Sequence, residues 1–223
     1  MEYYKRHSPV TFSSPPAQTQ VRKGWEVVLN CCNEGTGPFL IDLSHIAKWD
    51  VQGENLSQIR PAGINIPQHS GDCRFKDGIL INLVKWNWAI IWCFSEDELN
   101  FSHEYAYTDV TEAYALFALI GKGAFSIMEK VTNLDLTSPH KKTPFLLLGP
   151  ILHIRSQVVV LEKVKDEHVV LIACPRGYGQ SMAQALLEEG DEYGLRPGGE
   201  NAFTKWLKIA SADLLKNGNY SGR

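Results

Sequence analysis

The chain has 223 residues, 44% of them hydrophobic, so it is long enough to bury a core without disulfides or metals. Its 22 basic and 25 acidic residues give a net charge of −3 without long runs of either sign, which argues against a nucleic-acid partner. No window approaches 18 consecutive apolar residues, and the N-terminal stretch lacks the apolar segment of a signal peptide. We therefore expect a soluble, cytoplasmic protein with no membrane partner.

Five cysteines are scattered along the chain, including the neighbours Cys31 and Cys32. An odd number of cysteines fits a reducing compartment better than a disulfide framework. They form no Cys-x-x-Cys pair and are accompanied by no paired histidine spacing, so the sequence predicts no metal site.

The first half of the chain begins with an extended arm and continues in short β-rich runs. Residues 1–22 are rich in proline, serine, threonine and glutamine, so we expect an N-terminal arm that is mobile or lies across a surface. Glycine-containing turns then separate predicted antiparallel strands, with a long connection at 54–77. The predicted strands are 25–31, 38–43, 47–52, 78–86 and 87–94. The last two form a hairpin, and we expect Trp86, Trp88 and Trp92 on one face of it.

The second half combines strands with helices. A strand at 112–120 turns at Gly121 into a predicted helix at 124–132, whose apolar residues have helical spacing. Three further β-rich runs precede two helices, and the last helix is expected to stop at Asn217 and Gly218. The runs are 144–154, 157–164 and 168–175, and the helices are 180–190 and 200–218. Strand, helix, strands and helix predict an α+β arrangement of ferredoxin-like character.

Four phrases occur in the order in which one family has them. IDLSHIAKWDVQG (41–53) is similar to F-D-V-S-H-M-x-K-x-x-x-x-G, and DGILINLV (77–84) is similar to G-G-x-x-D-D-L-x-V. YTDVTEAYALFALIGKGAFSIMEKVTNLDL (107–136) resembles a strand, glycine turn and helix, and YGLRPGGENA (193–202) resembles G-L-x-P-x-G-x-x-A. Together they cover about residues 38–212 and resemble the glycine cleavage T-protein, or aminomethyltransferase, family. The wording ACPRGYGQSMAQALLE and the short length are more similar to the gamma-subunit branch of heterotetrameric sarcosine oxidase.

The resemblance implies an α+β, T-protein-type folate-binding fold with antiparallel sheets around a central hole, in which active members bind tetrahydrofolate. We expect the arm at 1–22 and one composite domain at 23–223. Its first part, about 23–105, is β-rich, and its second part, about 106–216, is ferredoxin-like. The C-terminal barrel domain of the family is expected to be absent, because 26 residues follow Pro197.

The sequence also places an acid, a hydroxyl and an imidazole within four residues, at Asp42, Ser44 and His45. Neighbours on an extended chain point to opposite faces, so we do not expect a nucleophilic triad here. The resemblance instead puts this phrase between two strands at the wall of the hole, which favours a structural role for all three side chains.

The chemistry of the family needs a carboxylate near the folate amine, and its two acids fall here on Ile81 and Asn82, neither of which ionises. The glutamate that reads the pterin falls on Glu167, although a solvated charge at a hairpin tip remains the competing interpretation. An arginine of the family becomes Phe203. The candidate folate site is therefore Asp42, Asn82 and Glu167, with no catalytic residue and no metal.

Two functions follow from these observations. The first is a non-catalytic subunit or accessory module of a larger redox or one-carbon complex, whose protein partners contact the tryptophans of the hairpin or the N-terminal arm. Burial of those tryptophans in the core is the competing interpretation. The second is an active, tetrahydrofolate-dependent aminomethyltransferase with a rearranged site around the pterin.

Overall fold

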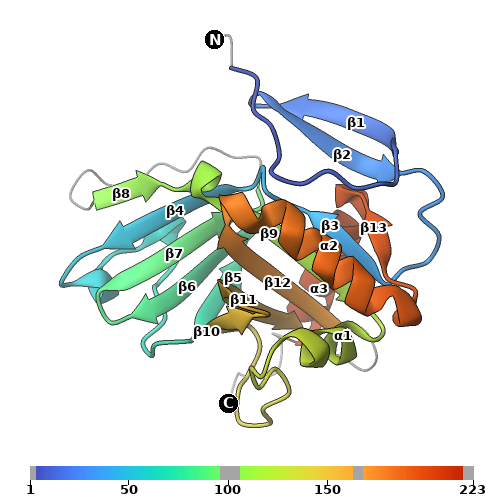
Figure 1. Cartoon of the computed structure of the whole chain (residues 1–223). Coiled ribbons are helices and arrows are strands. Elements are labelled where there is room, and N and C mark those ends of the chain that lie inside the picture. Colours follow the sequence, from blue (N-terminus) through green and yellow to red (C-terminus); the bar gives the residue numbers. More distant parts are fainter. Residues whose placement is uncertain (1–3, 96–105, 163–167, 218–223) are drawn as a thin grey trace.

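The structure is a computed structural model that describes residues 4–95, 106–162 and 168–217. Two larger β-sheets lie side by side, helices cover one of them, and a two-stranded hairpin extends beside the helices (Figure 1). The sheets are antiparallel apart from one short parallel pair. The predicted α+β class with antiparallel sheets is therefore confirmed.

The five-stranded sheet has the strand order β5-β6-β7-β4-β8 and is antiparallel throughout. Its strands are β4 (Ala47–Gln52), β5 (Cys73–Lys76), β6 (Ile79–Lys85), β7 (Trp88–Cys93) and β8 (Ala106–Asp109). Strand β5 lies within the stretch 54–77 that the sequence predicted as a connection. The prediction missed it because this edge strand exposes Arg74 and Lys76 and is only partly covered elsewhere, so its pattern is largely polar.

The six-stranded sheet has the strand order β10-β11-β12-β9-β3-β13. Its strands are β3 (Phe39–Asp42), β9 (Tyr114–Gly121), β10 (Phe145–Ile151), β11 (Ile154–Glu162), β12 (His168–Pro175) and β13 (Arg196–Gly198). Strand β3 is antiparallel to β9 and parallel to β13, so it joins a different sheet from β4, the next strand along the chain. The chain therefore crosses between the two sheets at residues 43–46.

Helices α1 (Ala124–Val131) and α2 (Gly179–Gly190) pack on one face of the six-stranded sheet (Figure 1). Helix α1 forms because its apolar residues recur at helical spacing, and the left-handed Gly123, with φ 87°, turns the chain from β9 into it. Helix α3 (Glu200–Asn217) follows β13 and packs against β2 and β3. In the ferredoxin-like part, two helices thus cover one face of an antiparallel sheet.

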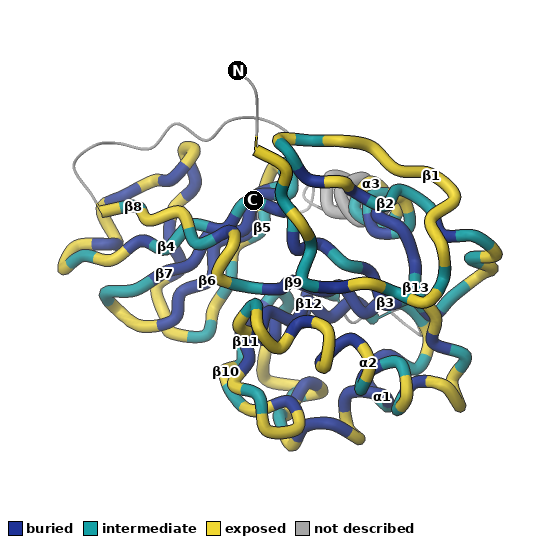
Figure 2. The backbone as a smooth tube through the Cα atoms, turned by 45° about the horizontal axis from the view of Figure 1, so that its top comes forward, coloured by how far each residue is buried: buried dark blue, intermediate teal, exposed yellow. Residues whose placement is uncertain are grey.

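Three apolar clusters form the core. Figure 2 shows the long buried stretches of backbone along β6, β9 and β12. The first lies between the six-stranded sheet and helices α1 and α2. The second, which we call the inter-sheet cluster, contains Leu116, Ala118 and Val159 from one sheet and Leu80 and Trp92 from the other. The third covers the opposite face of the five-stranded sheet with residues from the loop after β4. Because the second cluster draws on both sheets, it joins them into one packed unit.

The N-terminal residues contact the body of the molecule beside a hairpin of β1 (Pro16–Arg22) and β2 (Trp25–Cys31). Strand β1 lies inside the predicted arm at 1–22 and is exposed along most of its length (Figure 2). The division of the chain at residue 22 stays a prediction.

Trp88 and Trp92 share one face of the β6–β7 hairpin, but Trp86 does not, so the prediction is wrong for Trp86. Trp92 is 1% exposed and belongs to the inter-sheet cluster, and Trp88 packs partly against it. Trp86 lies in the turn between β6 and β7 and is 67% exposed. The alternation of a strand does not extend into the turn, because the turn residues leave the pleat.

Candidate functional site

Asp42 ends strand β3 and organises the turn that follows it. Its Oδ1 accepts a hydrogen bond from the Ser44 backbone N–H at 2.9 Å and one from the Ser44 hydroxyl at 2.5 Å. Its Oδ2 accepts a hydrogen bond from the Ser8 hydroxyl. The Ser44 oxygen in turn accepts a hydrogen bond from the Leu116 N–H at 3.2 Å, which ties the turn to β9. The carboxylate thus fixes the chain where it leaves one sheet for the other.

His45 pairs with an acid from the far end of the sequence. Its Nε2 lies 2.8 Å from Oε1 of Glu200, the first residue of α3, and Arg22 donates to the other oxygen of the same carboxylate. Burial by itself raises the pKa of Glu200, but the hydrogen bonds and charges of His45 and Arg22 outweigh burial and lower it. In the described residues no hydrogen bond joins His45 to Asp42 or Ser44, so the three do not form a triad.

Glycine at position 199 allows α3 to start directly against β2. A Cβ at Gly199 would lie 2.2 Å from the Leu29 carbonyl oxygen, which is closer than atoms can pack. The Gly199 N–H also donates to the carboxylate of Glu34. This close approach brings Glu200 to His45, and it gives the last glycine of the YGLRPGGENA phrase a structural reason.

Lys48 is a buried lysine that the sequence-based predictions missed. Its side chain is fully buried, and its Nζ donates to the carbonyl oxygens of Ser44 and Ile46 at 2.8 Å each and of Thr111 at 3.3 Å. Burial lowers the pKa of Lys48 to about 7, against the opposing charges of Asp42 and Asp109. Three carbonyls use its three donors, so Lys48 supports the turn. The lysine of the D-x-S-H-x-x-K phrase was the signal that could have identified it.

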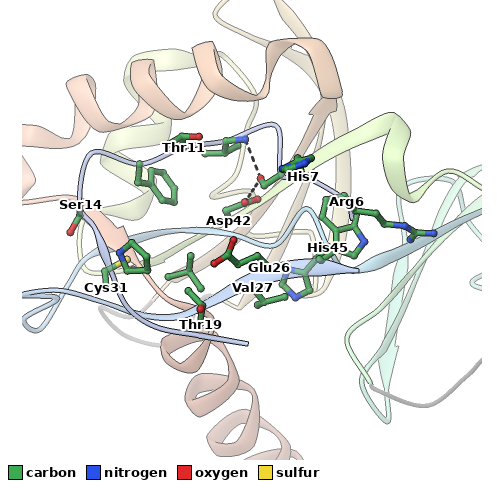
Figure 3. A pocket seen from close by; sticks show the side chains of 17 residues that line it. Arg6, His7, Thr11, Ser14, Thr19, Glu26, Val27, Cys31, Asp42 and His45 are labelled. Carbon is green, nitrogen blue, oxygen red and sulfur yellow. Dashed lines mark hydrogen bonds between the residues drawn. The ribbon is translucent and has the colours of Figure 1, made fainter. Parts of the chain in front are cut away.

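A pocket of about 280 Å³ lies between the N-terminal residues and strand β2. Figure 3 shows Asp42 and His45 at its wall, with Ser14 and Thr11 on the covering segment and Glu26 on β2. Both functional groups at this wall are already engaged, Asp42 with two serines and His45 with Glu200. The pocket is therefore a space under the N-terminal segment with its polar groups mostly satisfied from within the chain.

Asn82 lies in the middle of strand β6, between the edge strand β5 and β7, and has no exposed surface. It lies two positions from Leu80 and from Val84, so it shares their face of β6; both belong to the inter-sheet cluster, and its side chain therefore points toward the six-stranded sheet. Neither its Oδ1 nor its Nδ2 has a hydrogen-bond partner. An amide in this environment has no opening toward a ligand and has lost its hydration without replacement.

Aromatic side chains extend the inter-sheet cluster toward α3. The ring centroid of Phe203 lies 5.2 Å from that of Phe94 and 6.1 Å from that of Trp206. Phe94 also meets Phe75 edge to face at 6.3 Å. Phe203 stands where the resemblance has an arginine, so apolar rings occupy the place of a cation that would meet an anionic folate tail.

The structure thus places Asp42 at the pocket under the N-terminal segment and Asn82 inside the inter-sheet core, and it does not bring them to one cavity. Glu167 lies outside the described residues. The buried, unpartnered Asn82 and the apolar ring of Phe203 do not fit a bound tetrahydrofolate in this arrangement.

Two classes of feature are absent from the part of the chain that the structure describes. It contains no group of three or more histidine, cysteine, aspartate or glutamate side chains that could hold a metal ion. Within the same residues, no helix has the length and apolar character required to cross a membrane.

The fold and the site define an α+β protein in which two largely antiparallel sheets are joined by a shared apolar cluster. Models of known protein families give no match to the sequence. A stretch equal to 48% of this chain is 32% identical, over 114 residues, to the sarcosine oxidase subunit alpha of Rhizobium meliloti (strain 1021). The match spans 11% of that curated relative, so this chain corresponds to a small part of it.

A solved structure shows the same fold. It is the heterotetrameric sarcosine oxidase from Corynebacterium sp. U-96 in complex with pyrrole 2-carboxylate, one chain of which superposes on this protein with a TM-score of 0.59. The match covers 72% of this chain and 88% of that chain at 12% identity. At this identity the likeness establishes the fold, and it agrees with the T-protein-type fold that the sequence predicted.

Proposed function

We propose that this chain is a non-catalytic subunit or accessory module of a larger redox or one-carbon complex of the sarcosine oxidase type. The observation that carries the proposal is Asn82. Where the chemistry of the family requires a carboxylate, this chain buries a neutral, unpartnered amide against an apolar cluster. A buried amide cannot accept or release a proton at neutral pH, so transfer by the family mechanism lacks its base. The partial identity with a sarcosine oxidase subunit supports the role in a complex.

Trp86 is the side chain we propose as a contact with the partner. It is 67% exposed at the tip of the β6–β7 hairpin, beside the exposed Lys85. Exposed tryptophan is enriched at the centre of protein interfaces, where it buries a large apolar area at small entropic cost.

Purification of the tagged full chain from its native cells tests this proposal. We expect size-exclusion chromatography with light scattering to give a stoichiometric complex larger than the monomer, and we expect that complex to oxidise sarcosine. The Trp86→Ser variant should weaken the complex at least about tenfold, as expected for an interface anchor. Tyr178→Ser removes another exposed aromatic, which is 53% exposed and lies outside the β6–β7 hairpin, and serves as the matched control. A chain that elutes as a monomer at native concentrations would contradict the proposal.

The alternative function is an active tetrahydrofolate-dependent aminomethyltransferase with a rearranged site, formed by Asp42, Asn82 and Glu167. The unpartnered amide of Asn82 is the observation that favours it, because a pterin edge supplies both donors and acceptors. This alternative requires the inter-sheet cluster to open around Asn82.

Asn82→Leu separates the two functions. If the chain is an inert module, the substitution removes an unpartnered amide and raises the free energy of unfolding by about 1 kcal/mol, and tetrahydrofolate gives neither heat nor a thermal shift. If the alternative holds, calorimetric titration shows binding of tetrahydrofolate to the wild type, and Asn82→Leu abolishes it. Thr108→Val, on the same sheet at the edge strand β8, is the control for a polar-to-apolar change.

A further inference from the structure

A second pocket lies where the edge strands of the two sheets approach each other. Its volume is about 510 Å³, within the range of small-molecule sites. One wall is the segment 67–74, which leads into β5, and the other is the segment 140–145, which leads into β10. The Leu146 N–H donates to the Gly71 carbonyl at 2.7 Å, and an isolated antiparallel bridge between the neighbouring residues adds a second contact. The backbone therefore fixes the two walls relative to each other, although they are distant in the sequence.

The side chains that line this pocket are mostly basic. The basic lining residues are His69, Arg74, His140, Lys141 and Lys142, and the single acidic one is Asp72. None of the basic side chains forms an ion pair within the described part of the chain. Three cations thus share the pocket with one carboxylate, before either imidazole is protonated. Because the whole chain has a net charge of −3, this local excess of positive charge does not follow from composition.

The local structure presents these cations to solvent. Arg74 is exposed on β5, between Cys73 and Phe75, which pack partly against the inter-sheet cluster. On the other wall, the ammonium of Lys141 lies 5.4 Å from the ring centroid of Phe145. The Cys73 thiol adds no negative charge, because burial, and then the charge of Asp72, raise the pKa of Cys73 well above its ordinary value. The pocket is therefore suited to an anion.

We propose that this pocket binds a small ligand through a diphosphate group. Arg74 binds one phosphate through its planar fork, and Lys141 and Lys142, on the facing wall, bind the other as point charges. Two linked phosphates fit this arrangement because the cations lie on two walls, and a single phosphate reaches one of them. The site goes beyond the proposed function, because it uses neither a partner subunit nor Asn82.

Calorimetric titration of the isolated full chain tests the proposal with four probes. Inorganic pyrophosphate carries the linked phosphates, orthophosphate has one phosphate, and citrate is a polyanion without phosphate. We expect pyrophosphate to bind saturably with a Kd below about 1 mM at low salt, and orthophosphate and citrate to bind at least about tenfold more weakly. ADP is the fourth probe and distinguishes the source of the diphosphate. Equal affinity for ADP and pyrophosphate indicates a free diphosphate, and tighter binding of ADP indicates a nucleotide.

Three variants locate the site, and each replaces an exposed residue. Arg74→Gln and Lys142→Gln should each weaken pyrophosphate about five- to tenfold. Asp72→Asn should instead strengthen it about two- to threefold, because the substitution removes a charge of the same sign as the ligand. Arg60→Gln, which replaces an exposed arginine outside the pocket, is the matched control and should leave the affinity unchanged. Thermal midpoints without ligand should agree among all four variants, because none of the replaced side chains is buried.

Four results would overturn the proposal: no saturable heat with pyrophosphate in the millimolar range, equal binding of citrate and pyrophosphate, equal losses in Arg74→Gln and Arg60→Gln, or weaker binding in Asp72→Asn. These readouts use the isolated chain, so they are independent of the complex that the proposed function requires. A monomeric chain that still binds pyrophosphate would reject the subunit role alone.

Discussion

At the scale of single residues, the polar groups of the 41–53 phrase form a structural network. Asp42 accepts a hydrogen bond from the Ser44 hydroxyl, whose oxygen accepts one from the backbone of β9. Lys48 donates a hydrogen bond to the Ser44 carbonyl. Each group is buried or half-buried and paired, which is the condition under which polar groups can lie inside a fold without a large cost. His45 is not part of this network and forms its hydrogen bond with Glu200 instead.

The Glu200 carboxylate should make stability depend on acid pH. Its folded pKa lies below the ordinary value of 4.5, so its contribution is present above that pH and is lost as the pH falls through the folded pKa. Glu200→Gln should therefore lower the free energy of unfolding by about 1–3 kcal/mol at pH 7, and the gap to the wild type should shrink below about pH 4.5. Urea unfolding at a series of pH values measures the gap.

Glu54→Gln is the control for this effect, because Glu54 is exposed and has no ion pair among the described residues. A gap for Glu200→Gln that is constant from pH 7 to pH 3 would mean that the pairing with His45 and Arg22 does not depend on the ionised carboxylate.

At the scale of elements, the N-terminal segment before β1 is fastened at several separate points. Thr11 exchanges two hydrogen bonds with Gln180 of α2, at 2.7 Å and 3.1 Å. Arg176 donates to the His7 carbonyl, and its guanidinium lies 5.7 Å from the ring centroid of Trp25. Val10 is buried against the cluster beneath α2. The segment therefore closes the pocket beside Asp42 through contacts with α2 and the turn before it.

Gln180→Leu should loosen this segment without affecting the sheets. It removes both hydrogen bonds to Thr11, so amide hydrogen exchange at Thr11 should become about three- to tenfold faster, whereas exchange in β9 and β12 stays unchanged. Gln184→Leu, the same substitution one helical turn further along α2, is the matched control, because the Gln184 amide donates to Glu188 on its own helix. Equal exchange at Thr11 in both variants would show that these hydrogen bonds do not hold the segment.

At the scale of the whole molecule, the two sheets share one apolar interior. The inter-sheet cluster takes Trp92 and Leu80 from the five-stranded sheet, Leu116 and Val159 from the six-stranded sheet and Phe203 from α3. Strand β3 adds to this coupling. It pairs within the six-stranded sheet, whereas β4, the next strand along the chain, pairs within the five-stranded sheet. Units that share their core in this way unfold together.

Trp92→Ala should therefore destabilise both sheets at once. Truncation of this buried ring should cost about 3–5 kcal/mol, and urea unfolding followed by far-UV circular dichroism should keep a single transition at a lower midpoint. Amide exchange in β7 and β9 should accelerate in parallel. Trp86→Ala, at the exposed end of the same hairpin, should change the free energy of unfolding by less than about 0.5 kcal/mol. Two separate transitions would contradict a shared core.

The local pattern of apolar and polar residues was sufficient to predict the long, regular helices and strands. Helix α1 and strands β11 and β12 follow from apolar spacing, and the neutrality of Asn82 follows from its residue type. The short strands β8 and β13 were not predicted. They carry polar or turn-forming residues and are too short for the two-residue alternation of a strand to be recognised. The fold class and its likeness to sarcosine oxidase were therefore accessible before the structure.

The sequence by itself determined which residues can ionise, which segments alternate as strands or repeat as helices, and that a carboxylate is missing from β6. Tertiary structure alone decided that His45 meets Glu200, 155 positions away, that Trp86 is exposed while Trp92 is buried, and that Arg74 and Lys142 line one pocket. The physical reason is that residue type and spacing act within one element, whereas partners and burial depend on which distant elements pack together.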